Sequence, residues 1–196
     1  MKLILMLLLS CLMAGQALAG LEEELQTLLE KTLIENPQAP GISLCIICPP
    51  LDLDLSLAAG TVSRETTDPL TANHTFRIAS NTKTYVAAAI LRLVEMGRLQ
   101  LDRPVEKYLP RQWCQWLAGD GYDMQAITLE MILSHTSGLN DHASDERYPN
   151  EILADPGRPW SPDDQIHRLT EWFDPVGEPG EQFSYSDDGY IILGRV

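Results

Sequence analysis

The feature that most constrains the fold is an uninterrupted helical stretch that begins beside a serine and a lysine. Residues 82–96 are mostly good helix formers and include neither proline nor glycine. Four apolar side chains follow the i, i+4, i+7, i+8 spacing of a packed helix: Val86, Ile90, Leu93 and Val94. Alanines and Leu91 fill much of the remaining circumference. The pattern therefore predicts a buried helix that stops at Gly97.

The first turn of this predicted helix breaks a local rule. Such turns favour acidic residues, because their free N–H groups carry partial positive charge, but this one carries Lys83. Lys83 follows Ser80 by three residues, so one helical turn brings the amine close to the hydroxyl. Burial and the positive helix end both disfavour an ammonium, so we expect the pKa of Lys83 to fall and its neutral amine to deprotonate Ser80. The alternative is that Ser80 is an ordinary helix N-cap.

The composition excludes some classes of partner. The formal net charge of −14 argues against nucleic acid and anionic membranes, both of which attract basic patches. With 44% hydrophobic and 21% charged residues, the chain resembles a globular protein of one or two domains.

Residues 1–19 have the pattern of a signal peptide. Lys2 is followed by an apolar run, and Ala17-Leu18-Ala19 provides a small-x-small cleavage site before Gly20. A lipoprotein cleavage box ending at Cys11 is the alternative. No later run approaches the length of a membrane span. We therefore expect a periplasmic or secreted protein, cleaved after Ala19, whose mature part is residues 20–196.

The remaining cysteines do not form a recognisable metal or redox site. Cys45, Cys48 and Cys114 are an odd number, so they cannot all pair internally. Cys45 and Cys48 lie three apart in a strand-like run, where their side chains point to opposite faces, and no second cysteine pair completes a zinc set. We expect buried, unreactive thiols and no metal.

The rest of the chain is predicted to alternate short elements with loops. The expected elements are a helix over 21–34, strands over 42–47 and 53–57, and helices over 128–133 and 163–173. Residues 140–162 contain several prolines and are expected to be loop-rich. Thr128 can cap its helix, and His135 is interpreted as a structural histidine at the helix end, because the adjacent Ser134 points elsewhere.

Four blocks of sequence, in order and at consistent spacing, resemble the serine β-lactamase and penicillin-binding family. They are FRIASNTK at 76–83, LDRPVEKYLP at 101–110, ITLEMILSHTSGL at 127–139 and PGEQFSYSD at 179–187. The similarity is greatest to the branch of class C β-lactamases, D-alanyl-D-alanine carboxypeptidases and related esterases. It implies an α+β fold of the β-lactamase/transpeptidase type, with a helical subdomain against an antiparallel sheet.

The resemblance also implies a set of catalytic residues. In the family, the serine of S-x-x-K forms an acyl-enzyme, the lysine helps to deprotonate it, and the tyrosine of Y-x-N passes a proton to the leaving group. Carried over by motif, Ser80 is the nucleophile, Lys83 the base and Tyr185 the acid/base partner. A phenol can both accept and donate a proton, which suits that role. The backbone N–H of Ser80 would form half of an oxyanion hole, and no cofactor is implied.

Two departures from the family pattern bear on activity. The asparagine of Y-x-N is here Asp187, a substrate-binding position; an ionised aspartate cannot donate a hydrogen bond to a substrate carbonyl. We expect weaker binding of β-lactams and peptide amides, or a different substrate such as an ester. The third family motif, Lys or His followed by x-Gly, does not occur after Gly189. We therefore expect the last strands of the sheet to be missing, which leaves the amino-terminal hairpin with an unpaired edge.

These features predict an exported serine hydrolase that acts on a small-molecule or peptide substrate through acyl-Ser80. A D-alanyl-D-alanine carboxypeptidase-like or β-lactamase-like enzyme is the leading hypothesis, and an esterase of the same family is an alternative. A catalytically incomplete remnant that binds cell-wall peptide or a partner without turnover is another alternative. An α/β-hydrolase is disfavoured, because the sequence contains no G-x-S-x-G elbow.

Overall fold

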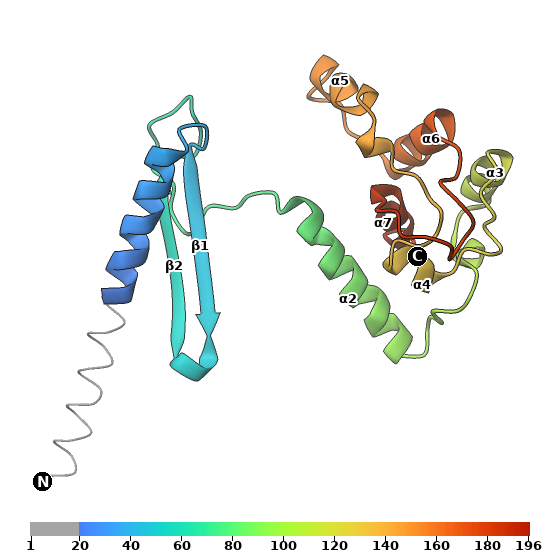
Figure 1. The fold of residues 1–196 in the computed structure, drawn as a ribbon, viewed down its shortest axis with the longest axis horizontal. Helices are drawn as coiled ribbons and strands as arrows, with labels where there is room; N and C mark the ends of the chain where they lie inside the picture. The colour runs from blue at the N-terminus through green and yellow to red at the C-terminus, as the bar shows by residue number, and fades with distance from the viewer. Residues whose placement is uncertain (1–19) are drawn as a thin grey trace, which may run out of the picture. The chain divides into compact units, whose positions relative to one another are not determined.

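The computed structural model describes residues 20–196, so the predicted signal peptide lies outside the described residues. The described chain forms two compact units, which meet in sequence between Arg77 and Ile78 (Figure 1). The first unit is a helix with a hairpin of strands, and the second consists of helices joined by loops.

In the first unit, a helix over residues 20–35 packs on one face of an antiparallel pair, β1 (Gly41–Cys48) and β2 (Leu53–Gly60). A 3-10 turn over Pro49–Leu51 joins the strands. Asp52, which precedes β2, has a left-handed φ of 51°. Proline suits this turn because it has no N–H to contribute to a strand ladder. Both predicted strands are present. Each is longer than the ranges 42–47 and 53–57 expected from the sequence.

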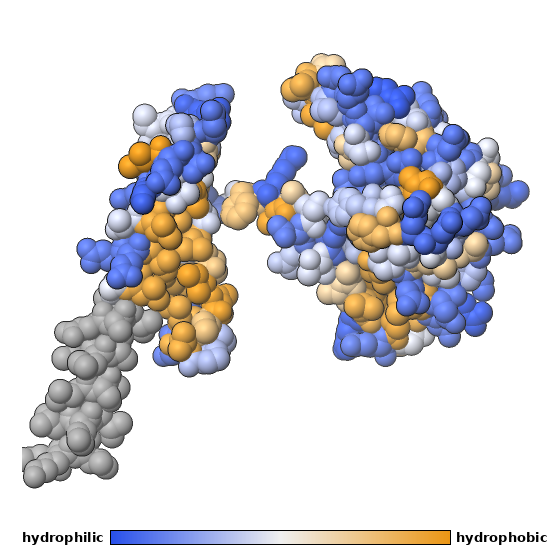
Figure 2. Space-filling view, viewed as in Figure 1, coloured by the Kyte–Doolittle hydropathy of each residue, from blue (hydrophilic) through white to orange (hydrophobic). Residues whose placement is uncertain are grey.

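The hairpin has one covered face. A small apolar cluster forms between helix and hairpin; its buried members are Leu29, Leu57 and Ala59. Ile47 and Leu51 are 68% and 67% exposed, and Figure 2 shows hydrophobic residues gathered over the hairpin. The expectation of buried thiols is wrong for Cys45, which is exposed, because alternate residues of β1 point away from the covered face. All three described cysteines are free, as predicted.

The second unit consists of six α-helices and short 3-10 turns. The helices are α2 (Thr82–Glu95), α3 (Arg111–Gly119), α4 (Leu129–Leu133), α5 (Arg147–Ala154), α6 (Pro162–Trp172) and α7 (Asp187–Leu193). Helices α2, α4 and α6 all contact α7 (Figure 1). The core is dense; its fully buried side chains include Val105, Trp113, Leu117, Leu129, Ile132, Ile166, Leu169 and Ile192. Along residues 20–196, no helix combines the length and the apolar character that crossing a bilayer requires.

Two expectations for the second unit were incomplete or wrong. Helix α5 lies inside the region expected to be loop-rich; Pro149 is tolerated because it falls in the first turn, where its N–H would have no helical partner. Helix α2 was expected to be buried, but in the described structure Ile90 is its only buried residue, and Tyr85 and Leu91 are 70% and 46% exposed. Only the predicted apolar stripe of α2 packs against the core.

Candidate active site

The site is built around the turn that leads into α2. Ser80 lies in a 3-10 turn over Ala79–Asn81, and Asn81, not Ser80, is the N-cap of α2, so the ordinary capping role does not apply to Ser80. Ala79 has a φ of 46°, a left-handed conformation that is uncommon outside glycine and that recurs at functional sites. The sequence thus presents the Ser80 hydroxyl on a sharp, strained bend at the mouth of a helix.

Three of the predicted residues meet at one oxygen atom. Lys83 Nζ lies 3.3 Å from Ser80 Oγ, as the one-turn spacing predicted. The hydroxyl of Tyr185 lies 2.9 Å from the same Oγ atom, although Tyr185 is 105 residues further along the chain. The structure therefore brings Ser80, Lys83 and Tyr185 into hydrogen-bond contact.

The fourth predicted residue, Asp187, contacts the lysine. Its carboxylate accepts a hydrogen bond from Lys83 and lies 3.4 Å from the Tyr185 hydroxyl. Asp187 is the first residue of α7, and the Ser186 side chain before it caps that helix by accepting the Gly189 N–H. The residue predicted to bind substrate is thus a hydrogen-bond acceptor whose partner is the Lys83 amine.

This contact reverses the predicted change in the pKa of Lys83. Burial lowers the pKa, as expected, but hydrogen bonds and charges from Asp187 and Tyr185 outweigh it, and the pKa is raised above 10.5. The expectation of a lowered pKa is therefore wrong, because it left out a carboxylate from a distant part of the chain. At neutral pH the resting amine is an ammonium.

His135, predicted to be structural, lies directly against the tyrosine. Its ring stacks on that of Tyr185, with centroids 4.5 Å apart and an interplanar angle of 27°. Its Nδ1 atom accepts the backbone N–H of Ser186 at 3.1 Å. The sequence placed His135 at the end of a helix, but its spacing to Tyr185 gave no signal of this contact.

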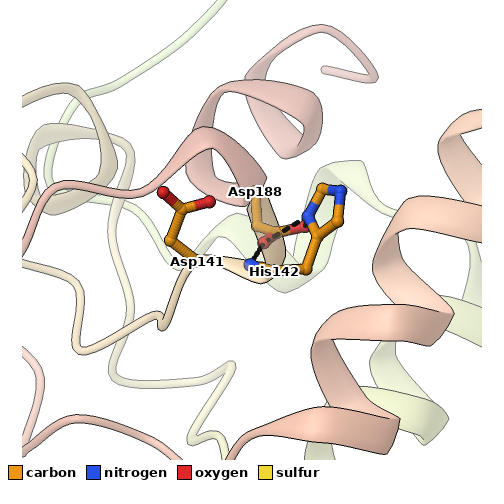
Figure 3. A group of neighbouring side chains, drawn as sticks. All are labelled: Asp141, His142 and Asp188. Carbon is orange, nitrogen blue, oxygen red and sulfur yellow. Dashed lines mark hydrogen bonds and ion pairs between the residues drawn. The ribbon is translucent and has the colours of Figure 1, made fainter. Parts of the chain in front are cut away.

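A cluster of three titratable side chains, Asp141, His142 and Asp188, lies near Asp187, and the sequence did not predict it (Figure 3). His142 and Asp188 are 1% and 0% exposed, and His142 Nδ1 lies 2.9 Å from both carboxylate oxygens of Asp188. Burial raises the pKa of Asp188, while the hydrogen bonds from His142 oppose that rise. Asp141 completes a group whose potential ligand atoms lie within 4.8 Å of one another.

The geometry of this group is that of a hydrogen-bonded imidazole–carboxylate pair. Both Asp188 oxygens face the His142 ring, and Asp188 also accepts the backbone N–H of His142 at 2.8 Å. A cation bound at Nδ1 would have to replace the proton that the pair shares, so these contacts favour the pair over a metal centre. His142 also lines a cavity of about 240 Å³ together with Lys83 and Asp187.

Two known proteins illustrate the sequence similarity of this chain to others. "Protein flp" of Staphylococcus aureus strain MW2 is 29% identical over 180 residues, which is 89% of this chain and 32% of that protein. Esterase EstB of Burkholderia gladioli is 45% identical over 82 residues, 42% of this chain and 20% of the esterase. The chain thus spans about a third of the length of the relative that it matches along most of its own.

The solved structures show the fold. The D-amino acid amidase of Ochrobactrum anthropi SV3 superposes with a TM-score of 0.70 at 24% identity, covering 86% of this chain and 42% of the amidase. The predicted α+β fold of the β-lactamase/transpeptidase type is therefore confirmed. The family model "Beta-lactamase" matches residues 27–196, which include all four predicted site residues. The chain belongs to the beta-lactamase family.

Proposed function

We propose that the protein is a serine hydrolase that forms an acyl-enzyme on Ser80 and acts on small esters in preference to amides. The observation that carries this proposal is the meeting of two proton-carrying groups, Lys83 and Tyr185, at Ser80 Oγ. A nucleophile in contact with a candidate base, which is in turn held by a third group, is the arrangement that activates a hydroxyl for acyl transfer.

The contacts suggest a balanced order of proton transfers. Lys83 first loses a proton to solvent, against the stabilising effect of the Asp187 carboxylate on the ammonium, which leaves a neutral amine. That amine takes the Ser80 proton as Oγ attacks the substrate carbonyl carbon. When the tetrahedral intermediate collapses, Tyr185 protonates the leaving oxygen and regains its proton from Lys83, which is then a neutral amine again. Water then repeats the sequence on the acyl-Ser80 ester and releases the acid.

The position of Asp187 favours esters. The amine of an amide substrate leaves only after protonation, whereas the alcohol or phenol of an ester leaves more easily. Because the Lys83–Asp187 pair holds its proton tightly, we expect the hydrolysis of amides to be slowed more than that of esters. A carboxylate also cannot donate a hydrogen bond to a substrate carbonyl. The local similarity to an esterase, 45% over 82 residues, supports the same substrate class. Peptide amides of the D-alanyl-D-alanine type and β-lactams are then the weaker substrates.

Labelling tests the proposal. The purified chain would be incubated with a fluorophosphonate and with a fluorescent penicillin, and p-nitrophenyl esters would be compared with the matching anilides. We expect fluorophosphonate labelling of Ser80, faster ester than anilide hydrolysis, and loss of both in Ser80→Ala. Ser56→Ala, at an exposed serine of β2 in the first unit, is the matched control. Labelling by penicillin with turnover of anilides would favour a D,D-peptidase or β-lactamase, and a folded chain labelled by neither reagent would favour a binding remnant.

We also propose that this hydrolase is exported. The support is the sequence alone: Lys2, the apolar run after it and the small residues that end at Ala19. N-terminal sequencing of the protein from its native host would then begin at Gly20. A mature protein that keeps Met1 would contradict the proposal.

A further inference from the structure

We propose that His135 is the positioning residue that holds Tyr185 against Ser80, and that it does so in its neutral form. This inference rests on the proposed roles of Ser80 and Tyr185 in acyl transfer. It concerns a histidine that touches neither Ser80 nor Lys83 by any hydrogen bond among residues 20–196.

The first argument is the way in which His135 binds the backbone on both sides of Tyr185. The carbonyl oxygen of His135 accepts the N–H of Ser184 at 2.7 Å. Its side-chain Nδ1 accepts the N–H of Ser186 at 3.1 Å. One residue therefore holds the Phe183–Ser184 peptide and the Tyr185–Ser186 peptide, which lie on either side of the tyrosine, so the Cα atom of Tyr185 can move little while both bonds are present.

The second argument is the conformation that makes this double contact possible. His135 follows Ser134, the C-cap of α4, and has a φ of 57°, in the left-handed region that non-glycine residues seldom adopt. In that conformation its carbonyl and its ring both face residues 184–186. The strain of such a conformation persists only where the surrounding contacts over-determine it.

The third argument is the packing of the ring. Besides stacking on Tyr185, the His135 ring lies 5.2 Å from the ring of Tyr190 and 5.9 Å from that of Phe183, measured between centroids. Tyr190 is itself tied to α4, because its hydroxyl donates to the Leu133 carbonyl at 3.1 Å. The imidazole thus fixes the plane of the Tyr185 ring as well as its backbone, and so directs the hydroxyl to Ser80.

The hydrogen bond from Ser186 identifies the protonation state that works. A nitrogen that accepts an N–H carries no proton, so the neutral ring has its proton on Nε2, and a doubly protonated ring cannot accept this bond. The titratable groups facing His135 are Lys83 of α2, Tyr185, and Asp187 and Tyr190 of α7. Burial and then the Lys83 charge lower the pKa of His135 below 6.5, against an opposing effect of Asp187. Acidification through this lowered pKa should therefore release Ser186 and loosen Tyr185.

Two substitutions separate positioning from general packing. Asparagine tolerates the left-handed conformation and offers an acceptor oxygen near the position of Nδ1, but it does not titrate and has no ring. Alanine offers no acceptor. We expect His135→Ala to lower kcat for an ester substrate about 10- to 100-fold with a small change in KM, as for a misplaced catalytic group. His135→Asn should recover the part of that loss that the acceptor supplies, and should remove the decline in kcat that His135 protonation causes in acid. His167→Asn, at an exposed histidine of α6, is the control.

A measurement without turnover separates this inference from the proposed function. In the ¹⁵N-labelled Ser80→Ala chain, we expect His135 Nδ1 to show the chemical shift of an unprotonated nitrogen at neutral pH. The Ser186 amide should shift with the same midpoint as the His135 ring when the sample is acidified. A protonated Nδ1 at neutral pH, or a Ser186 amide that does not respond, would overturn the inference even if Ser80 is labelled. Equal losses in His135→Ala and His135→Asn with an unchanged acid limb would also overturn it.

Discussion

The two units of the chain build their interiors very differently. In residues 20–77, the buried apolar cluster consists of Leu29, Leu57 and Ala59, between one helix and one face of a hairpin. In residues 78–196, many buried side chains from five helices and several loops form one continuous core. The first unit is a thin layer, and the second has a three-dimensional interior.

All four predicted site residues, and His135, belong to the unit with the dense core. A catalytic arrangement needs its groups held to within a fraction of an ångström, which requires support from packed neighbours. Helix α7 illustrates this support: Asp187 and Asp188 are adjacent, and one meets Lys83 while the other is buried with His142. The contacts that hold the site residues in place are therefore contacts within the second unit.

The largest difference between the units should appear in the chemistry. Lys83→Ala removes the amine beside Ser80, so we expect the rate of ester hydrolysis to fall about 10²- to 10⁴-fold, the usual contribution of a positioned acid or base. Lys31→Ala, at a 69%-exposed lysine of the first unit, should leave the rate unchanged. Steady-state kinetics on both variants would measure this, and a Lys83→Ala enzyme with normal activity would refute the assigned role.

Core truncations should show the next largest difference. Leu129 is 0% exposed in the core of the second unit, so Leu129→Ala should lower the free energy of unfolding by about 3–5 kcal/mol. Leu29, 7% exposed in the small cluster of the first unit, has fewer neighbours to lose, and Leu29→Ala should cost about 2 kcal/mol. Urea unfolding of both variants would measure this. A larger loss for Leu29→Ala would show that the first unit is the better packed.

The parts of this picture that the sequence predicted are those that short spacings determine. The three-residue separation of Ser80 and Lys83 predicted their contact, and Thr128 caps α4 by accepting the Met131 N–H, as its position indicated. The four blocks of similarity predicted the fold and placed Tyr185 in the site.

What the sequence did not predict depends on contacts between distant residues. The raised pKa of Lys83 comes from Asp187, 104 residues away, and the buried pair of His142 and Asp188 joins positions 46 residues apart. The exposed side of α2 was missed for a similar reason. Its apolar pattern shows which residues could be buried, but burial depends on the elements that pack against them.

The Lys83–Asp187 pair can be tested through pH. Asp187→Asn removes the carboxylate whose hydrogen bond and charge raise the pKa of Lys83, so that pKa should fall. A base works in its unprotonated form, so the acid limb of kcat/KM should move to lower pH, with about a tenfold gain at neutral pH for each unit of pKa. Asp52→Asn, at a left-handed turn residue of the first unit, is the control, because asparagine tolerates that conformation. An unmoved limb would mean that Lys83 is not the group that titrates.

The smallest expected difference in stability concerns polar contacts at the surface: a helix cap in the second unit and an exposed ion pair in the first. Ser161 Oγ accepts the Asp164 N–H at 3.1 Å and Asp164 accepts the Ser161 N–H at 3.0 Å, so this capping box satisfies two backbone donors at the start of α6. Ser161→Ala should therefore lower the free energy of unfolding by about 1 kcal/mol.

The comparison is with the ion pair between Lys31 and Glu35 of the first unit, whose side chains are 69% and 62% exposed. Water and salt already solvate both groups, so Lys31→Ala should cost roughly 0–0.5 kcal/mol, and less still at high ionic strength. Urea unfolding with and without added salt would distinguish the two effects. Because the cap orients α6, which contributes Ile166 and Leu169 to the core, its loss should persist at high salt. A salt-sensitive loss at Ser161, or an equal loss at Lys31, would mean that exposed charges and not caps stabilise this chain.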